Sequence, residues 1–292
     1  MPPPLVSTTW FHRYTLTGRS NPRHTHFLRA AFNAVVDIGV LCSIILAIYF
    51  IALRRIPPNS RGFQCNDPAL LQPYQDNSIP TKHLLAVTLA LPFFVILVEF
   101  WLDAGSPLSI QDILRDNQLA RIIRNTTIVY LDYINAFGGM TFAIELLKCA
   151  VGRLRPNFFA MCQPDVSSCG LDPDAFISSF ECTANPAKRA RNAQMSFPSG
   201  HAAAAVLPVL FFMYFLRRVS NQSQIGFRRI FQILVIVFFG VFAVYCCATR
   251  VWDNWHFISD VGGGIVLGLL YFYASLGRYQ GDYFKDGKSK AN

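Results

Sequence analysis

The apolar residues of this chain are gathered into six long runs that are separated by shorter polar stretches. The runs cover roughly residues 31–53, 83–104, 126–147, 202–216, 230–249 and 257–275. A run of about 20 apolar residues is long enough to cross a bilayer core of ~30 Å as a helix. The pattern therefore predicts an all-α fold, a six-span transmembrane helix bundle over residues 31–275 with polar tails at 1–30 and 276–292.

The basic residues between the runs indicate which side of the membrane each loop occupies. Six spans place both termini on one side, and cytoplasmic loops carry the excess of Lys and Arg. Segment 217–229 holds four Arg and no acidic residue, which favours the cytosol for this loop and for both tails. The remaining loops, which we call the outer loops, are then expected outside the cell or in a lumen. They are 54–82, 148–201 and 250–256.

Composition narrows the class of partner. The chain is 52% hydrophobic and 15% charged, with a net charge of +9, which excludes an ordinary soluble domain. Its basic residues suit anionic lipid headgroups or phosphorylated substrates. No soluble basic domain is present to carry nucleic acid, so membrane phospholipids are the expected partner. Homo-oligomerisation is left open by the sequence.

Cysteines and acidic residues give two further expectations. Cys65, Cys162, Cys169 and Cys182 fall in outer loops, where an oxidising space favours disulfides, although the pairing cannot be read from the sequence. The acidic side chains inside the runs are costly in lipid and should face the interior of the bundle. These residues are Asp37, Glu99, Asp103, Asp132 and Glu145.

The first of three polar motifs follows the third run and reads Lys148-Cys-Ala-Val-Gly-Arg-Leu-Arg155-Pro156. Lys148 and Arg155 are seven apart, so a helix would place them on one face, about 10.5 Å apart along its axis. Pro156 disfavours helical geometry at Arg155, so we expect the helix to end there. Together the two side chains could close on one anion. Taken alone, they could equally be basic residues that snorkel at a membrane edge.

The second motif, Ser196-Phe-Pro-Ser199-Gly200-His201, opens the fourth run. Ser199 and Gly200 at a helix start would leave backbone N–H groups directed outward, and such an N-terminus binds phosphate well. His201 would lie in the first turn and face the same anion. The alternative is a Ser cap with an incidental His.

The third motif, Thr249-Arg-Val-Trp-Asp-Asn-Trp-His-Phe-Ile-Ser-Asp260, joins the last two runs. His256 and Asp260 are four apart, so on a helix they would share a face. The carboxylate could then bond one imidazole nitrogen and leave the other free to react. Arg250 is suited to holding an anion. The alternative is an interfacial hydrogen-bonded pair with no chemistry.

The predicted topology puts all three motifs on the outer side of the bundle. Together they supply three cations, a helix N-terminus and two His, which are the groups needed for phosphoryl transfer through a covalent enzyme intermediate. Two His and an Asp could instead ligate zinc, or two His a haem, but the neighbouring cations disfavour a bound metal. We therefore predict neither a metal nor another cofactor.

The motifs resemble the signature of the type 2 phosphatidic acid phosphatase superfamily, which reads Lys-x6-Arg-Pro, Pro-Ser-Gly-His and Ser-Arg-x5-His-x3-Asp. Thr249 stands where the family usually has Ser. Arg61-Gly-Phe-Gln-Cys65-Asn-Asp and Gly152-Arg-Leu-Arg-Pro156 are similar to the animal lipid phosphate phosphatases, also called phospholipid phosphatases, of the Wunen-like branch.

The resemblance implies a role for each motif residue. His256 would be the nucleophile that becomes phosphohistidine, Asp260 would orient it, and His201 would be the general acid that protonates the leaving lipid hydroxyl. The phosphate oxygens would be held by Lys148, Arg155, Ser199, Gly200 and Arg250. The family acts without magnesium. We expect a multi-pass protein of the plasma membrane, with the endoplasmic reticulum or Golgi as alternatives.

The resulting hypothesis is a membrane lipid phosphate phosphatase that releases inorganic phosphate. The sequence does not choose among phosphatidic acid, lysophosphatidic acid, sphingosine 1-phosphate and ceramide 1-phosphate. One alternative is a non-catalytic phospholipid-binding or lipid-uptake protein. Another is a sugar-phosphate or polyprenyl-diphosphate phosphatase of the same superfamily.

Overall fold

Long helices occupy the six apolar runs in the computed structural model. It describes residues 23–52, 56–103, 118–170, 172, 174–184, 187–219 and 226–279. Most of both predicted tails, and residues 220–225 of the predicted cytoplasmic segment, lie outside this range. The first run is helical in α1 (Arg23–Ala52) as far as residue 52, and the second is α2 (Thr81–Leu85), a short π-helical segment η1 (Ala86–Ala90) and α3 (Leu91–Asp103). The other four are α5 (Gln118–Val151), α8 (Gly200–Val219), α9 (Phe227–Trp252) and α10 (Ile258–Tyr279).

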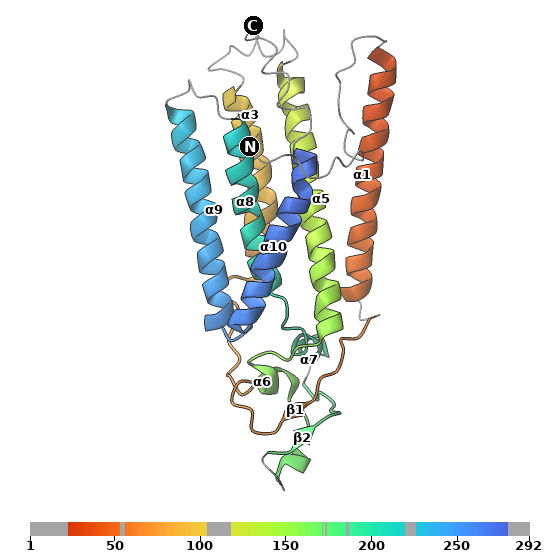
Figure 1. Ribbon diagram of the computed structural model, residues 1–292, viewed down its shortest axis with the longest axis vertical. Coiled ribbons are helices and arrows are strands. Elements are labelled where there is room, and N and C mark those ends of the chain that lie inside the picture. Colours follow the sequence, from red (N-terminus) through yellow and green to blue (C-terminus); the bar gives the residue numbers. More distant parts are fainter. Residues whose placement is uncertain are drawn as a thin grey trace, which may run out of the picture.

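The long helices run side by side as one bundle (Figure 1). Within the described ranges, five segments are long and apolar enough to cross a membrane, namely Thr81–Leu102, Ile122–Val151, Gly200–Arg217, Phe227–Trp252 and Ile258–Leu276. In α1 the apolar stretch among the described residues is Ile38–Ile51, which is shorter than a full crossing. The all-α membrane bundle is thus confirmed, and the first of the six spans stays a prediction.

Aromatic side chains fill the interior of the bundle between α5, α8 and α9. Tyr133, Phe211, Phe212 and Phe239 are almost completely buried, and the rings of Phe212 and Phe239 stack with centroids 4.9 Å apart. The outward side of α9 is also apolar, and Val244 there is 72% exposed. An apolar outer face is what lipid requires, because no water is available to solvate polar groups.

The acidic residues of the runs were predicted to face the interior, and Glu99 does so. It is completely buried, and it accepts hydrogen bonds from Nε of Arg228 at 2.8 Å and from Nε2 of Gln232 at 2.6 Å. Asp132 is also buried. The side chains of Asp37 and Asp103 lie outside the described residues.

The outer loops gather at one end of the bundle, where α9 ends and α10 begins (Figure 1). They contain α6 (Phe158–Cys162), a 3-10 turn η2 (Ser167–Gly170) and α7 (Ala187–Asn192). The strands β1 (Phe63–Gln64) and β2 (Phe176–Ile177) pair antiparallel, with Phe63 opposite Ile177. These outer loops have a small apolar core of their own. In it the rings of Phe63, Phe158 and Phe180 contact one another in edge-on or tilted geometry.

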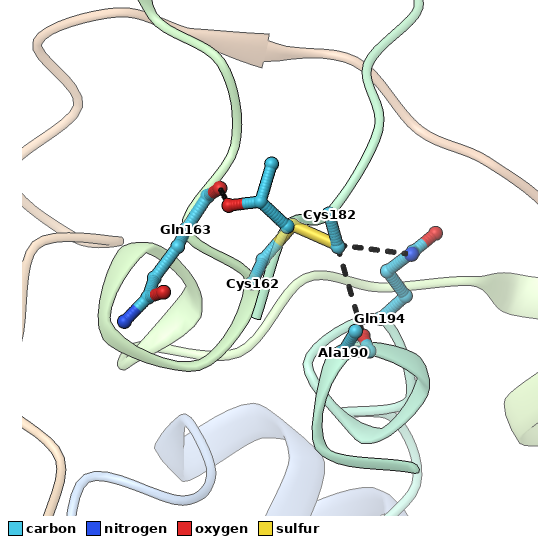
Figure 2. Close-up of a disulfide and its surroundings, with 6 residues drawn as sticks. Cys162, Gln163, Cys182, Ala190 and Gln194 are labelled. Atoms are coloured by element: carbon cyan, nitrogen blue, oxygen red, sulfur yellow. Dashed lines mark hydrogen bonds between the residues drawn. A yellow bond between two sulfur atoms is a disulfide. The ribbon is translucent and has the colours of Figure 1, made fainter. Parts of the chain in front are cut away.

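Two disulfides hold the outer loops together. Cys65 is bonded to Cys169, which joins the first outer loop to the second, and Cys162 is bonded to Cys182. Figure 2 shows the second bond, which ties the end of α6 to the chain leading into α7, near Ala190 and Gln194. All four loop cysteines are therefore paired, in an arrangement that the sequence had left open.

Candidate active site

Arg250, His256 and Asp260 lie around the turn that joins α9 to α10. Arg250 is in the last turn of α9, His256 is in the turn itself, and Asp260 is in the first turn of α10. The prediction that His256 and Asp260 share a helical face was wrong, because α9 stops at Trp252 and the chain bends before α10 starts at Ile258. The bend still brings Nδ1 of His256 to 3.8 Å from Oδ2 of Asp260.

The carboxylate of Asp260 is buried and fixed by donors from three parts of the chain. Oδ2 accepts from the Ser196 hydroxyl at 2.6 Å and from the Phe257 backbone N–H at 2.9 Å. Oδ1 accepts from Nη1 of Arg153 at 2.6 Å. The bond from the Phe257 N–H, at the residue before α10, to Asp260 in its first turn is one half of a capping box, so the start of the helix helps to fix the orientation of the carboxylate.

His256 is only 4% exposed, and its Nε2 lies 3.2 Å from Nη1 of Arg155. A guanidinium only donates, so Nε2 accepts, and a neutral ring then carries its proton on Nδ1, on the side of Asp260. Burial, followed by the charge of Arg155, lowers the pKa of His256 from 6.5 to about 3, although Asp260 opposes the shift. The ring is therefore neutral at neutral pH, and the Nε2 lone pair is suited to act as a nucleophile.

The path from Lys148 to Arg155 differs from the predicted helix. α5 ends at Val151, and Gly152 takes a left-handed conformation with φ of 60°. A Cβ at Gly152 would lie 1.8 Å from the carbonyl oxygen of Asn59, so the chain leaves the helix through a turn that only glycine fits. Lys148 and Arg155 therefore do not share a helical face, and Arg155 reaches the site from a loop.

Backbone carbonyls anchor the guanidinium of Arg155. Its Nε donates to Asn192 at 2.6 Å, its Nη2 to Met195 at 3.0 Å, and its Nη1 to Trp255 at 2.7 Å. Burial lowers the pKa of Arg155 to about 10, so the group stays charged at neutral pH. Arg155 is thus a fixed cation whose Nη1 faces Nε2 of His256.

Lys148 and the second motif meet at the N-terminus of α8. The Lys148 Nζ donates to Glu145 at 2.6 Å, and a Cβ at Gly200 would lie 3.5 Å from this Nζ. Ser199 is completely buried, and its backbone N–H donates to the carbonyl of Asp260 at 3.0 Å. α8 begins at Gly200, as predicted, so its first N–H groups open beside the Lys148 amine.

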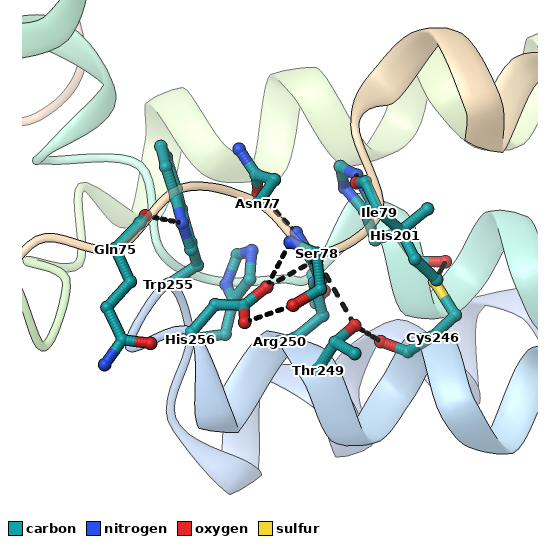
Figure 3. Close-up of polar contacts among 12 residues, drawn as sticks. Gln75, Asn77, Ser78, Ile79, His201, Cys246, Thr249, Arg250, Trp255 and His256 are labelled. Atoms are coloured by element: carbon teal, nitrogen blue, oxygen red, sulfur yellow. Dashed lines mark hydrogen bonds and ion pairs between the residues drawn. The ribbon is translucent and has the colours of Figure 1, made fainter.

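His201 and Arg250 are both in contact with the first outer loop (Figure 3). Nε2 of His201 lies 3.2 Å from the carbonyl oxygen of Ile79. Arg250 is 1% exposed, and its Nη1 donates to the side-chain oxygen of Asn77 at 2.5 Å. Its Nη2 lies 3.1 Å from Asp253. The structure thus brings together all eight residues predicted for the site.

Comparison with known proteins gives the family of this chain. The model of the PAP2 superfamily matches residues 129–282, more than half of the chain. This chain belongs to the PAP2 superfamily. It is similar to phospholipid phosphatase 1 of Mus musculus, with 28% identity over 87% of each chain, and to the Rattus norvegicus protein of the same name, with 30% identity over 87% of each. Phospholipid phosphatase 2 of Mus musculus is 30% identical over 86% of this chain and 87% of its own. No solved structure gives a significant match.

Three residues that contact the PAP2 motif side chains were missed although they lie inside the motifs. Arg153 and Ser196 bond Asp260, and Asp253 bonds Arg250. The sequence could have indicated them, because each is a polar residue within a motif to which no role had been assigned. Asn77 and Ser78 come from the first outer loop, and the sequence carried no signal for them.

Gly264 is a further residue that the sequence did not single out. A Cβ there would lie 2.3 Å from the carbonyl oxygen of Ser199, so its absence lets α10 approach the start of α8. This close approach is what places the N-terminus of α8 against Asp260. As for metals, no group of three or more His, Cys, Asp or Glu within the described ranges is arranged to hold an ion.

Proposed function

We propose that this PAP2 superfamily member is an integral membrane phosphatase that hydrolyses lipid phosphomonoesters to the dephosphorylated lipid and inorganic phosphate. The observation that carries the proposal is the contact between Nε2 of His256 and Nη1 of Arg155, because it gives a buried neutral imidazole with its lone pair beside a fixed cation. The similarity to proteins named phospholipid phosphatases supports a lipid as the substrate.

The proposed reaction has two steps. Nε2 of His256 attacks the phosphorus atom, the bond between phosphorus and the lipid oxygen breaks, and His201 supplies the proton that the leaving oxygen takes up. Water then attacks the phosphohistidine while His201 takes a proton from it, which releases phosphate and restores both imidazoles. Asp260 stabilises the charge that His256 gains. The phosphoryl oxygens bind Lys148, Arg155, Arg250 and the N-terminus of α8 formed by Ser199 and Gly200.

The cations of this site take the part that a metal ion plays in other phosphatases, so the reaction proceeds without magnesium. We place the site on the extracellular or lumenal face, with both termini in the cytosol and the plasma membrane as the first location to examine. The two disulfides support an oxidising compartment for the outer loops.

Purified protein in detergent micelles tests the function directly. Phosphate release from phosphatidic acid should be abolished by His256→Ala and strongly reduced by His201→Ala, and it should persist in a chelator. Near-normal release by His256→Ala would remove the covalent mechanism, and loss of activity on chelation would remove the metal-free one. A panel containing lysophosphatidic acid, sphingosine 1-phosphate, ceramide 1-phosphate and a soluble sugar phosphate identifies the substrate class.

A further inference from the structure

The end of the first outer loop, residues 73–79, lies across the site (Figure 3). Oxygen atoms of every second residue in it accept hydrogen bonds from residues of the second and third motifs. The pairs are Pro73 O with Asn254 at 3.2 Å, Gln75 O with Trp255 at 2.9 Å, Asn77 Oδ1 with Arg250 at 2.5 Å and Ile79 O with His201 at 3.2 Å. An extended segment presents alternate residues to one side, which explains this spacing.

Asp253 accepts two hydrogen bonds from this segment. Its Oδ2 accepts from the Ser78 backbone N–H at 2.8 Å, and its Oδ1 accepts from the Ser78 hydroxyl at 2.7 Å. The same Oδ2 lies 3.1 Å from Nη2 of Arg250. Asp253 is buried, so one carboxylate holds both the loop and the cation in place.

These contacts occupy part of the Arg250 guanidinium and leave the rest available. Nη1 is bonded to Asn77, and Nη2 to Asp253 and Thr249. Nε is buried and has no hydrogen-bond acceptor among the described residues. A buried N–H without an acceptor is costly, so this donor points to a ligand. The charge of Arg250 also lowers the pKa of Arg155, so the two cations interact electrostatically across the site.

We propose that Asp253 and Asn77 are positioning residues of the phosphate site, which hold the two terminal nitrogens of Arg250 so that its Nε–H is directed to a phosphoryl oxygen. Ser78 completes the arrangement by fixing Asp253 to the loop. The inference rests on the proposed phosphatase function. It gives a role to Asp253, Asn77 and Ser78, to which the family resemblance assigns none.

A matched pair of Asp→Asn substitutions tests the proposal on full-length protein in detergent micelles. Asp253→Asn removes the buried carboxylate, whereas Asp76→Asn makes the same change at an exposed carboxylate of the same loop, which accepts from Tyr74 at 3.1 Å. We expect Asp253→Asn to lower kcat/KM for phosphatidic acid by about 10- to 100-fold, since small misplacements of a reacting group have effects of that size. Asp76→Asn should stay within about twofold of wild type, as most surface substitutions do.

Binding of orthovanadate, which mimics the pentacoordinate phosphoryl group, provides a readout that does not depend on turnover. Vanadate should raise the unfolding temperature of wild type and of Asp76→Asn, and should do so much less for Asp253→Asn. A purely structural role would lower the unfolding temperature of Asp253→Asn itself but leave kcat/KM and vanadate affinity of the folded fraction unchanged. Equal behaviour of the two Asn variants would overturn the proposal.

Three further variants, at Asn77 and Ser78, cover the case in which Asp253→Asn fails to fold. Asn77→Ala leaves Asp253 in place and should weaken vanadate binding in the same direction. Ser78→Ala should lower kcat/KM, and Ser78→Thr should restore it, because Thr keeps the hydroxyl. In an Arg250→Lys background, Asp253→Asn should add little, since it acts through the guanidinium. A full additive loss there would contradict the inference.

The outcomes also separate this inference from the function on which it rests. If wild type releases no phosphate from any substrate of the panel, the proposed function fails, and vanadate binding still decides whether Asp253 positions Arg250. If wild type is active and Asp253→Asn matches Asp76→Asn, only the positioning role fails.

Discussion

Nη1 of Arg155 lies 3.2 Å from Nε2 of His256, and the same Nη1 is held by the carbonyl of Trp255 at 2.7 Å. Arg155 therefore fixes which nitrogen of the imidazole accepts and which carries the proton. A residue from the second outer loop thus sets the tautomer of a residue in the third, about a hundred positions away in the chain. The charge of Arg155 also adds to the effect of burial in lowering the pKa of His256.

The buried imidazole of His256 should make the folded state sensitive to acid. Its pKa is about 3 in the folded protein and about 6.5 when unfolded, so the unfolded chain takes up the proton first as pH falls. Stability linked to His256 is fully present above pH ~6.5 and is lost progressively between pH ~6.5 and ~3. The groups that act on its charge are Arg155, Asp260 and Lys148.

Unfolding temperatures of wild type and His256→Asn, compared at steps from pH 8 to pH 4 in detergent, check this expectation. The Asn variant cannot take up the proton, so its curve should be flatter than that of wild type below pH ~6.5. Parallel curves through that window would contradict a lowered pKa for His256.

Arg153 should tune His256 through Asp260. Nη1 of Arg153 donates to Oδ1 of Asp260 at 2.6 Å, and its side chain is 34% exposed. Arg153→Gln removes the positive charge that offsets the carboxylate, so Asp260 stabilises protonated His256 more strongly and the pKa of His256 rises. The acid limb of the kcat/KM profile should move to higher pH, and activity at neutral pH should fall by about fivefold or less, as for partly exposed ion pairs.

Arg153→Lys is the matched control, because it keeps the charge and loses the planar fork. Its acid limb should lie closer to wild type than that of Arg153→Gln. If the two variants have the same profile, or if neither differs from wild type, Arg153 does not act on His256 through its charge.

Packing of α10 against the start of α8 should depend on Gly264. A Cβ there would lie 2.3 Å from the Ser199 carbonyl oxygen, whereas a Cβ at Gly262 of the same helix would meet no atom within 4 Å. Gly264→Ala should therefore separate the two helices, lower stability by about 1–3 kcal/mol and reduce phosphatase activity. Gly262→Ala should be neutral or slightly stabilising, because Ala favours a helix more than Gly does.

Thermal unfolding and phosphate release, measured on both Ala variants, decide this prediction. Similar results for the two would show that the close approach at Ser199 is not needed for the site.

The pairing of the outer cysteines can be tested by peptide mapping under non-reducing conditions. We expect linked peptides that contain Cys65 with Cys169 and Cys162 with Cys182. Since the first bond joins two outer loops, Cys65→Ser should lower the temperature at which activity is lost, and a reductant should do the same to wild type. Cys42→Ser, at a free exposed cysteine, is the control and should change neither. Any other pairing would contradict this arrangement.

Local spacing was a good guide to which residues meet and a poor guide to how they meet. His256 and Asp260 are neighbours as predicted, but a bend brings them together rather than a shared helix. Lys148 and Arg155 reach one site, but Gly152 ends α5 between them. In both cases a turn interrupts the helix that the spacing argument assumed, and such turns depend on contacts with distant segments. The carbonyl of Asn59 beside Gly152 is one example.

The sequence by itself determined the membrane bundle and predicted eight residues for the site. Runs of apolar residues must be buried in lipid, and the types and spacing of polar residues at their ends define the chemistry. Only the tertiary structure decided the disulfide pairing, the tautomer of His256 and the contacts of Arg153, Asp253, Asn77 and Ser78. These depend on segments far apart in the chain, and no local periodicity carries information about such contacts.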